Sequence, residues 1–179
     1  MKKITKSLLL CLFVLTSTSC TIQNSELRTI EYLDIEEFMG DWYVIAVIPT
    51  FLEKDIFNAI ENYTMNSDGT ISTEFSFNKY DFNGERKKYN PKGFIMDKNS
   101  NALWGMQFIW PIKADYRVVY LSDDYSYTII GRNKRDYVWL MSRLPMMSDD
   151  DYSNAMSFIE SIGYDMTKIV KIPQKWSEK

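Results

Sequence analysis

From residue 42 onward, short runs of alternating apolar and polar residues are separated by tight turns. Alternation with a period of two predicts β-strands, because successive side chains of a strand point to opposite faces of a sheet. The turns contain Asn, Asp or Gly, which tolerate left-handed backbone conformations. We therefore predict eight strands, over residues 42–48, 59–65, 70–80, 87–96, 103–110, 116–121, 125–131 and 137–144.

The order of these strands predicts an all-β architecture. No helical pattern separates them, so consecutive strands should form hairpins in an antiparallel, up-and-down sheet. Closing that sheet into an eight-stranded β-barrel removes its exposed edges, and a barrel of this size has room for one small ligand. A short helical turn is predicted at residues 33–38, before the first strand.

One α-helix is predicted after the barrel. Ser148 is a suitable N-cap, three aspartates follow it in the first turn, and Gly163 is placed to end the helix. Apolar residues recur at helical spacing, which predicts that one face packs against the outside of the barrel: Tyr152, Ala155, Met156, Ile159 and Ile162. Residues 169–172 are predicted to form a short last strand.

The first residues have the pattern of a secretory signal. Three lysines precede an apolar run at residues 8–15, which is too short to span a membrane as a helix. Small residues then lead to Cys20, and this arrangement resembles the cleavage box of bacterial lipoproteins, in which the cysteine sulfur receives a diacylglycerol. We predict a lipoprotein signal peptide over residues 1–19 and lipidation of Cys20. The alternative is an ordinary signal peptide cut near Ser19.

The rest of the chain is then expected to be a tether and one domain without internal linkers. Residues 20–29 are predicted to be a tether and residues 30–179 a single domain. Removal of residues 1–19 would remove three lysines and no acids, which changes the formal net charge from −3 to −3 − 3 = −6. Such a protein should stay soluble, with its acyl anchor as the contact with the membrane.

Composition excludes several kinds of chemistry. The chain has no histidine, which excludes Ser-His-Asp and Cys-His catalysis and imidazole metal sites. Its two cysteines, Cys11 and Cys20, both lie in the first twenty residues, so no disulfide can cross-link the folded domain. The negative net charge offers no basic patch for nucleic acid. We predict no catalytic residues, no cofactor and no metal, although acid–base catalysis by an Asp/Glu pair stays open as a minor alternative.

Three separated segments resemble the signature of the lipocalin family. Gly40-Asp41-Trp42-Tyr43 matches the Gly-x-Trp-Tyr that opens the first barrel strand, and Asp123-Asp124-Tyr125 is similar to the family's Thr-Asp-Tyr turn. Arg143 stands at the end of the last barrel strand, where the family has an arginine. The run at residues 136–145 looks like the bacterial branch of lipocalins in particular, and the resemblance covers almost the whole mature chain.

The resemblance implies roles for the signature residues. Gly40 should allow a sharp turn into the first strand, Trp42 should close the narrow end of the barrel, and Arg143 should stack on the Trp42 ring. These residues, with Asp124 and Tyr125, are expected to be structural rather than ligand contacts. The family resemblance also implies a lipid-anchored outer-membrane protein, on the periplasmic face, that stores or transports a fatty acid or lysophospholipid.

Strand alternation predicts a lining for the cavity. If Arg143 and Trp42 point inward, residues at intervals of two on their strands should do the same, and an apolar loop and a turn should frame the mouth. The predicted ligand contacts are Val44, Ala46, Phe51, Trp110, Tyr137, Trp139 and Met141. Three residues are candidates for a cationic contact with a lipid head group at the rim: Lys54, Lys113 and Arg117. The sequence does not choose among them. The alternative function is a structural or interaction lipoprotein whose barrel is filled by side chains.

Overall fold

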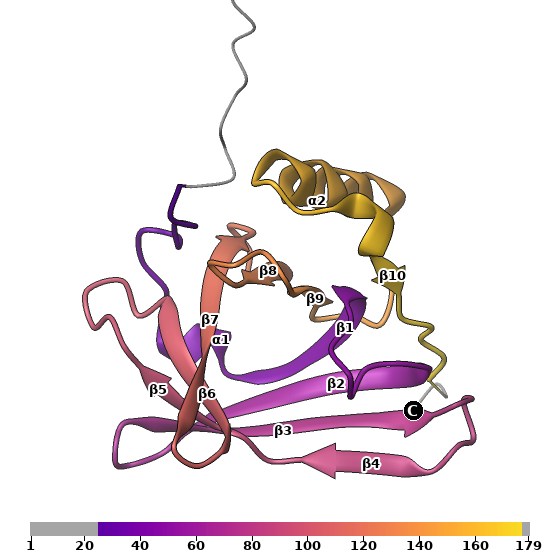
Figure 1. Cartoon of the computed structure of the whole chain (residues 1–179), viewed down its shortest axis with the longest axis horizontal. Coiled ribbons are helices and arrows are strands. Elements are labelled where there is room, and N and C mark those ends of the chain that lie inside the picture. The colour runs from indigo at the N-terminus through magenta and orange to yellow at the C-terminus, as the bar shows by residue number, and fades with distance from the viewer. Residues whose placement is uncertain (1–24, 177–179) are drawn as a thin grey trace, which may run out of the picture.

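A computed structural model describes residues 25–176, so the predicted signal peptide at 1–19 and Cys20 lie outside the described residues. The described chain forms an antiparallel β-barrel (Figure 1). Its strands are β1 (Gly40–Ile48), β2 (Ile56–Met65), β3 (Thr70–Lys79), β4 (Arg86–Tyr89), β5 (Lys92–Ile95), β6 (Leu103–Ile109), β7 (Ile112–Leu121), β8 (Tyr127–Gly131) and β9 (Val138–Ser142). Neighbouring strands pair in this order, and β1 also pairs with β9, which closes the barrel.

The predicted strand at residues 87–96 is divided in two. Both β4 and β5 pair with β3, so together they occupy one position and the barrel has the eight predicted strands. Pro91 lies at the division, and proline has no N–H to donate to a strand ladder. Only β5 continues the pairing to β6, which begins at Lys92 opposite Gln107.

Several strand ends differ from the sequence prediction. β7 begins at Ile112 instead of residue 116, because Trp110 and Pro111 form a tight turn between β6 and β7 rather than a longer break. β8 begins at Tyr127 because Tyr125 lies in the preceding turn with a φ of 56°. The turn at residues 67–69 between β2 and β3 is where the sequence predicted it, and Gly69 there has a φ of 78°.

The helical elements lie at one end and on one side of the barrel. The short helix α1 (Ile35–Phe38) is capped by Asp34, whose carboxylate accepts hydrogen bonds from the N–H groups of Glu36 and Glu37. The long helix α2 (Asp149–Ser161) begins with Ser148 as N-cap, as predicted. It lies across the outside of the barrel above β8 and β9 (Figure 1). None of the helices in the described region has the length and apolar character needed to cross a membrane.

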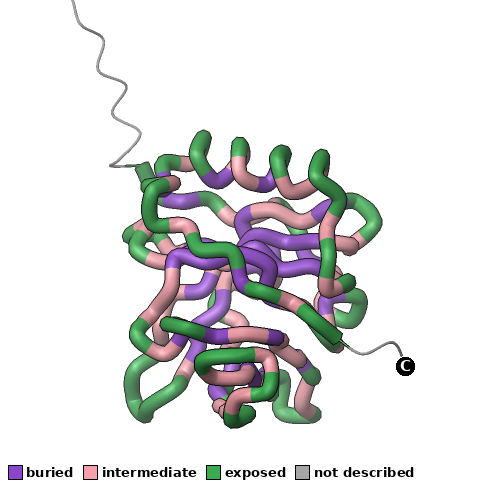
Figure 2. The backbone as a smooth tube through the Cα atoms, turned by 90° about the vertical axis from the view of Figure 1, so that its right-hand side faces the viewer, coloured by how far each residue is buried: buried purple, intermediate pink, exposed green. Residues whose placement is uncertain are grey.

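The face that α2 turns to the barrel is the predicted one. Ala155 and Ile159 are buried against the barrel, and the turns on the opposite face are exposed (Figure 2). A 3₁₀ turn, η2 (Met166–Lys168), then leads to β10 (Val170–Lys171), which pairs antiparallel with β1. This short strand confirms the prediction for residues 169–172 with narrower limits.

Part of the predicted tether is folded onto the barrel. The side chain of Leu27 is buried beneath the loop after β8, and its N–H donates to the Asn133 side chain over 2.8 Å. Arg117 donates to the Leu27 carbonyl and forms an ion pair with Glu26 at 3.0 Å. These contacts hold Glu26 and Leu27, within the predicted tether, on the surface of the barrel.

Candidate ligand-binding cavity

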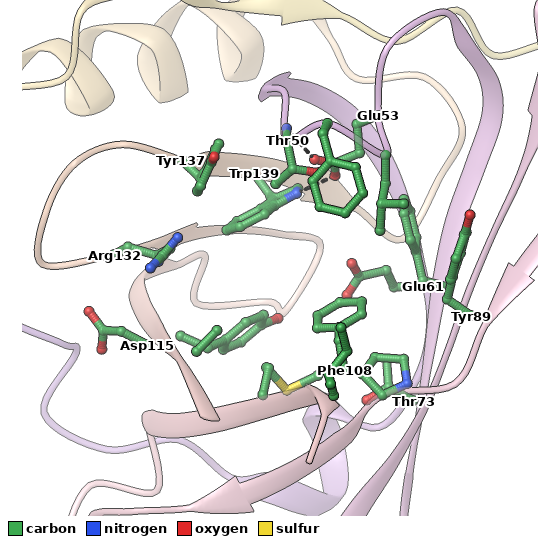
Figure 3. Close-up of a pocket in the computed structure, with 18 residues that line it drawn as sticks. Thr50, Glu53, Glu61, Thr73, Tyr89, Phe108, Asp115, Arg132, Tyr137 and Trp139 are labelled. Atoms are coloured by element: carbon green, nitrogen blue, oxygen red, sulfur yellow. Dashed lines mark hydrogen bonds between the residues drawn. The ribbon is translucent and has the colours of Figure 1, made fainter. Parts of the chain in front are cut away.

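The barrel encloses a cavity of about 360 Å³ that opens to solvent. Figure 3 shows the side chains that line it. This volume lies in the range of about 300–1,000 Å³ that is typical of small-molecule sites. The walls come from the β1–β2 loop and from β2, β3, β4, β6, β7 and β9. Most of the lining is apolar or aromatic, as in Phe75, Tyr89, Met106, Phe108, Ile109 and Tyr116.

The structure places three of the seven predicted contacts at the cavity. Tyr137 and Trp139 line it from the segment that forms β9, and Phe51 lines it from the β1–β2 loop. Val44 and Met141 are fully buried in the cluster inside the barrel, so their side chains point inward as predicted, but they are not among the cavity-lining residues.

The other two predicted contacts lie elsewhere. Trp110 is 82% exposed in the β6–β7 turn, one residue beyond the lining residue Ile109. Ala46 is buried on the outer face of the barrel, in the cluster beneath α2. The placement of Ala46 inside the barrel was wrong because the pairing of β1 with β9 shifts between Val44 and Ala46. An irregularity of this kind reverses the alternation that the sequence argument assumed.

The signature residues close one end of the barrel in the predicted way. Trp42 is fully buried, and its indole N–H donates to the Phe38 carbonyl over 2.8 Å. The Arg143 guanidinium lies 3.7 Å from the centre of the Trp42 ring and donates to the carbonyls of Asp41 and Glu37. Gly40, two residues before Trp42, has a φ of 93°, a conformation that favours glycine.

Asp124 and Tyr125, in the turn before β8, also have structural roles. The Asp124 carboxylate accepts from the backbone N–H of Ser126 over 3.1 Å and so stabilises the turn into β8. The hydroxyl of Tyr125 accepts from the backbone N–H of Asp34 over 3.0 Å and connects the turn to the start of α1. Neither residue lines the cavity.

A glutamate holds the β1–β2 loop against the cavity. Glu53 is only 4% exposed, and its carboxylate accepts from the backbone N–H of Thr50 over 2.8 Å and from the Trp139 indole N–H over 2.5 Å. Burial raises the pKa of Glu53, although both hydrogen bonds act in the opposite direction. Trp139 thus has two roles, as a wall of the cavity and as the partner that fixes this loop.

A second carboxyl group, Glu61 of β2, lines the cavity together with two phenols. The Tyr63 hydroxyl donates to Glu61 and lies 2.6 Å from the Tyr116 hydroxyl. Burial raises the pKa of Glu61 to about 7; the Tyr63 hydrogen bond opposes this rise and the charge of Glu53 adds to it. Burial, followed by the charge of Glu61, raises the pKa of both phenols well above its usual range.

Two of the three cationic candidates from the sequence are engaged elsewhere, and the third, Lys54, is exposed and does not line the cavity. Arg117 donates through Nε to Asp115 and through Nη1 to the Leu27 carbonyl, and Lys113 lies over the Phe94 ring at 3.6 Å. Among residues 25–176, the cationic side chain that lines the cavity is Arg132, in the turn after β8, which forms an ion pair with Asp136 at 3.3 Å. No group of three or more metal-ligating side chains occurs in residues 25–176.

Sequence reasoning missed the polar and charged side chains of the lining, which are Thr50, Glu53, Glu61, Thr73, Asp115 and Arg132. For Glu61 a signal exists, because its neighbours at intervals of two, Ala59 and Tyr63, belong to the inner cluster of the barrel. Glu53 and Arg132 lie in irregular segments, where no periodicity shows the direction of a side chain.

Comparison with known proteins agrees with this geometry. The family model described as a lipocalin-like domain matches residues 33–174. The chain belongs to the lipocalin family. The proteins of this family bind small hydrophobic ligands and are generally not enzymes. Temperature-induced lipocalin-1 of Arabidopsis thaliana is 32% identical over 161 residues, with 85% of each chain covered.

Bacterial relatives and solved structures extend the comparison. Outer membrane lipoprotein Blc of Escherichia coli is 23% identical over 168 residues, covering 92% of this lipocalin and 93% of Blc. Insecticyanin from the tobacco hornworm Manduca sexta has a TM-score of 0.67 at 17% identity, with 86% of each chain covered. Lobster apocrustacyanin A1 has a TM-score of 0.62 at 16% identity, covering 80% of this chain and 81% of that one. These structures share the fold.

Proposed function

We propose that this lipocalin stores or transports a lipid, a fatty acid or a lysophospholipid, with its acyl chain inside the barrel. The observation that carries the proposal is the cavity of about 360 Å³ with aromatic and apolar walls. Each methylene buried there contributes about 0.8 kcal/mol before the cost of ordering the chain is subtracted. The same cavity argues against the alternative of a barrel filled by its own side chains.

The test is a titration of the delipidated protein with fatty acids and lysophospholipids of increasing chain length. Affinity should rise with chain length until the cavity is full and then level off, at about one ligand per barrel. Binding should change the intrinsic fluorescence of Trp139, which lines the cavity. Trp139→Ala should therefore remove much of the signal, and a short acid should bind poorly.

A matched control is Trp110→Phe, because Trp110 is 82% exposed and lies outside the lining. This variant should keep the ligand-dependent fluorescence change. If the folded protein showed no saturable response to any acyl chain, the filled-barrel alternative would replace the proposal.

We also propose that acylated Cys20 anchors the protein in the outer membrane. Support comes from the sequence pattern before Cys20 and from bacterial relatives named outer membrane lipoproteins. Cys20→Ala should leave the protein soluble, or uncleaved at the inner membrane, whereas Cys11→Ala should be processed normally. Fractionation that finds processed Cys20→Ala protein in the outer membrane would overturn this anchor.

A further inference from the structure

Arg132 lines the cavity at the open end of the barrel. It directly follows β8, in the turn to β9. Because consecutive strands run in opposite directions, this turn lies at the same end as the β1–β2 loop and the hairpin of β6 and β7, which contribute Phe51 and Ile109 to the lining. The opposite end is closed by Trp42 and Arg143. A ligand that enters the cavity therefore passes close to the guanidinium group of Arg132.

The guanidinium group of Arg132 is only partly satisfied by the protein. Within residues 25–176, its ionic partner is the Asp136 carboxylate, 3.3 Å from Nη1, and its Nε has no hydrogen-bond partner. The Arg132 side chain is 20% exposed, whereas that of Asp136 is 38% exposed and can be hydrated instead. A guanidinium has five N–H donors, and one long ion pair occupies few of them. A cation that is partly removed from water and incompletely paired favours the binding of an anion.

The surroundings of Arg132 fix its position. Its backbone N–H donates to the hydroxyl of the buried Tyr164 over 2.9 Å, and the guanidinium carbon lies 5.2 Å from the centre of the Tyr137 ring. Figure 3 shows the guanidinium between Tyr137 and Asp115, directed toward the space between the lining side chains. A guanidinium that is already held in place loses little conformational freedom when it binds an anion, so more of the interaction contributes to affinity.

The carboxyl groups of the lining do not cancel the charge of Arg132. Asp115, the nearest in Figure 3, already accepts from Arg117 Nε over 2.9 Å and 3.1 Å and from a backbone N–H over 2.6 Å. Glu53 and Glu61 lie on the other side of the cavity in the same view. Burial raises the pKa of both, which reduces their negative charge near neutral pH. An anion beside Arg132 is therefore attracted by the guanidinium without a close, uncompensated carboxylate.

We propose that Arg132 binds the anionic head group of the lipid, the carboxylate of a fatty acid or the phosphate of a lysophospholipid, at the mouth of the cavity. This inference rests on the proposed binding of an acyl chain in the barrel and adds the contact that orients the ligand. Oxygens of the anion accept hydrogen bonds from Nη1 and Nη2. The acyl chain extends inward along Phe75, Met106 and Tyr116, which line the cavity and belong to the inner cluster of the barrel.

The experiment compares dodecanoate, dodecanoyl lysophosphatidylcholine and dodecanol, each below its micelle concentration, by calorimetry with the delipidated full chain. At about pH 8 the fatty acid is ionised. Arg132→Gln should lower the affinity for dodecanoate, for the lysophospholipid or for both by about 10–100-fold, the range for hydrogen bonds to a charged group. The affinity for dodecanol should change by less than about twofold, because an uncharged alcohol forms no ionic contact. Arg132→Lys should recover part of the loss, since lysine keeps the charge but not the planar fork.

Two variants of the same turn serve as controls. Lys134→Gln removes the same charge from an exposed residue that does not line the cavity, and it should bind all three ligands as wild type does. Asp136→Asn removes the ionic partner of Arg132. If Arg132 acted only by stabilising the turn through this ion pair, Asp136→Asn would weaken binding as Arg132→Gln does. Our proposal predicts instead that the affinity for the anions is unchanged or rises by up to about fivefold, because Asp136 no longer competes for the guanidinium.

A measurement on the wild-type protein decides the question even if Arg132→Gln fails to fold. The carboxyl pKa of bound dodecanoate, labelled with ¹³C at the carboxyl carbon and followed by NMR, should be lower than that of the free monomer, because the guanidinium stabilises the ionised form. A raised pKa would place the carboxyl group beside Glu61 and overturn the proposal.

The calorimetric outcomes separate this contact from the proposed function. A loss confined to one of the two anionic ligands identifies the head group that Arg132 binds. Unchanged affinities for both anions in folded Arg132→Gln would overturn the contact while acyl-chain binding stands, and so would an equal loss for dodecanol. If the wild-type protein bound none of the three ligands, dodecanol included, the proposed binding function itself would be rejected.

Discussion

The contact between Trp42 and Arg143 should be a main source of stability at the closed end of the barrel. Trp42 is fully buried, its ring centre lies 4.9 Å from that of Phe38, and the Arg143 guanidinium lies 3.7 Å from its ring centre. We consider Trp42→Ala, Arg143→Ala and the double variant, because a double-mutant cycle separates the interaction of two residues from their individual effects.

The structure allows the magnitudes to be estimated. Trp42→Ala removes a large buried side chain and its hydrogen bond to Phe38, and should lower the free energy of unfolding by about 3–5 kcal/mol. Arg143→Ala removes the ring contact, worth about 0.5–2 kcal/mol, and the two hydrogen bonds to backbone carbonyls. The free energy of unfolding should decrease less than for Trp42→Ala, because Arg143 is partly exposed and water can replace its hydrogen bonds. The coupling energy should equal the ring contact, about 0.5–2 kcal/mol.

Urea unfolding and thermal unfolding, both followed by circular dichroism, would measure all four proteins. For a domain of this size, the loss of 3–5 kcal/mol corresponds to a decrease in Tm of about 6–20 °C for Trp42→Ala. Arg143→Lys provides a control, since lysine keeps the charge but lacks the planar fork that reaches two carbonyls while stacking on a ring. A Trp42→Ala melt that matches wild type, or additive effects in the double variant, would refute this account of the closed end.

Three further variants test other features of the fold. Glu61→Gln should match the stability of wild type near pH 4 and exceed it by about 3 kcal/mol at pH 8. The pKa of Glu61 is raised from 4.5 to about 7 on folding, so the wild-type protein loses stability as pH rises between these values. If chemical denaturation gave the same pH dependence for the variant and the wild type, it would contradict the burial of this carboxyl. Gly40→Ala should cost about 1–3 kcal/mol, since alanine is strained at a φ of 93°. Ala46→Asp should destabilise the protein strongly by placing a charge beneath α2. The folded fraction should keep its affinity for a long-chain fatty acid, and weakened binding would place Ala46 inside the barrel after all.

The regular part of the fold could be predicted because strand alternation and turn residues are local signals. The alternation of β9 correctly placed Trp139 and Met141 inward, and the apolar stripe of α2 correctly identified its packing face. The predictions failed where one residue interrupts the regularity. A register shift after Val44 turned Ala46 outward, and Pro91 divided one predicted strand into two.

The polar part of the site was less predictable, and the reason is physical. Glu53 reaches the cavity because a loop folds back and Trp139, far away in sequence, donates to its carboxylate over 2.5 Å. Arg132 reaches it from a turn. Neither segment has a period from which a direction follows, and a charged residue in a loop is usually solvated. Only the closure of the barrel brings these residues together.

The packing at the closed end of the barrel does not need the carboxyl group of Glu61. Below the cavity, Trp104 and Tyr116 stack at 5.2 Å and pack with Phe38 and Tyr63, so apolar contacts alone would close the barrel. Two phenols there need partners, but a neutral side chain would satisfy them without the loss of stability that an ionised, buried carboxylate brings at neutral pH. A group that weakens the fold in the absence of ligand and faces a cavity is best explained by what it binds.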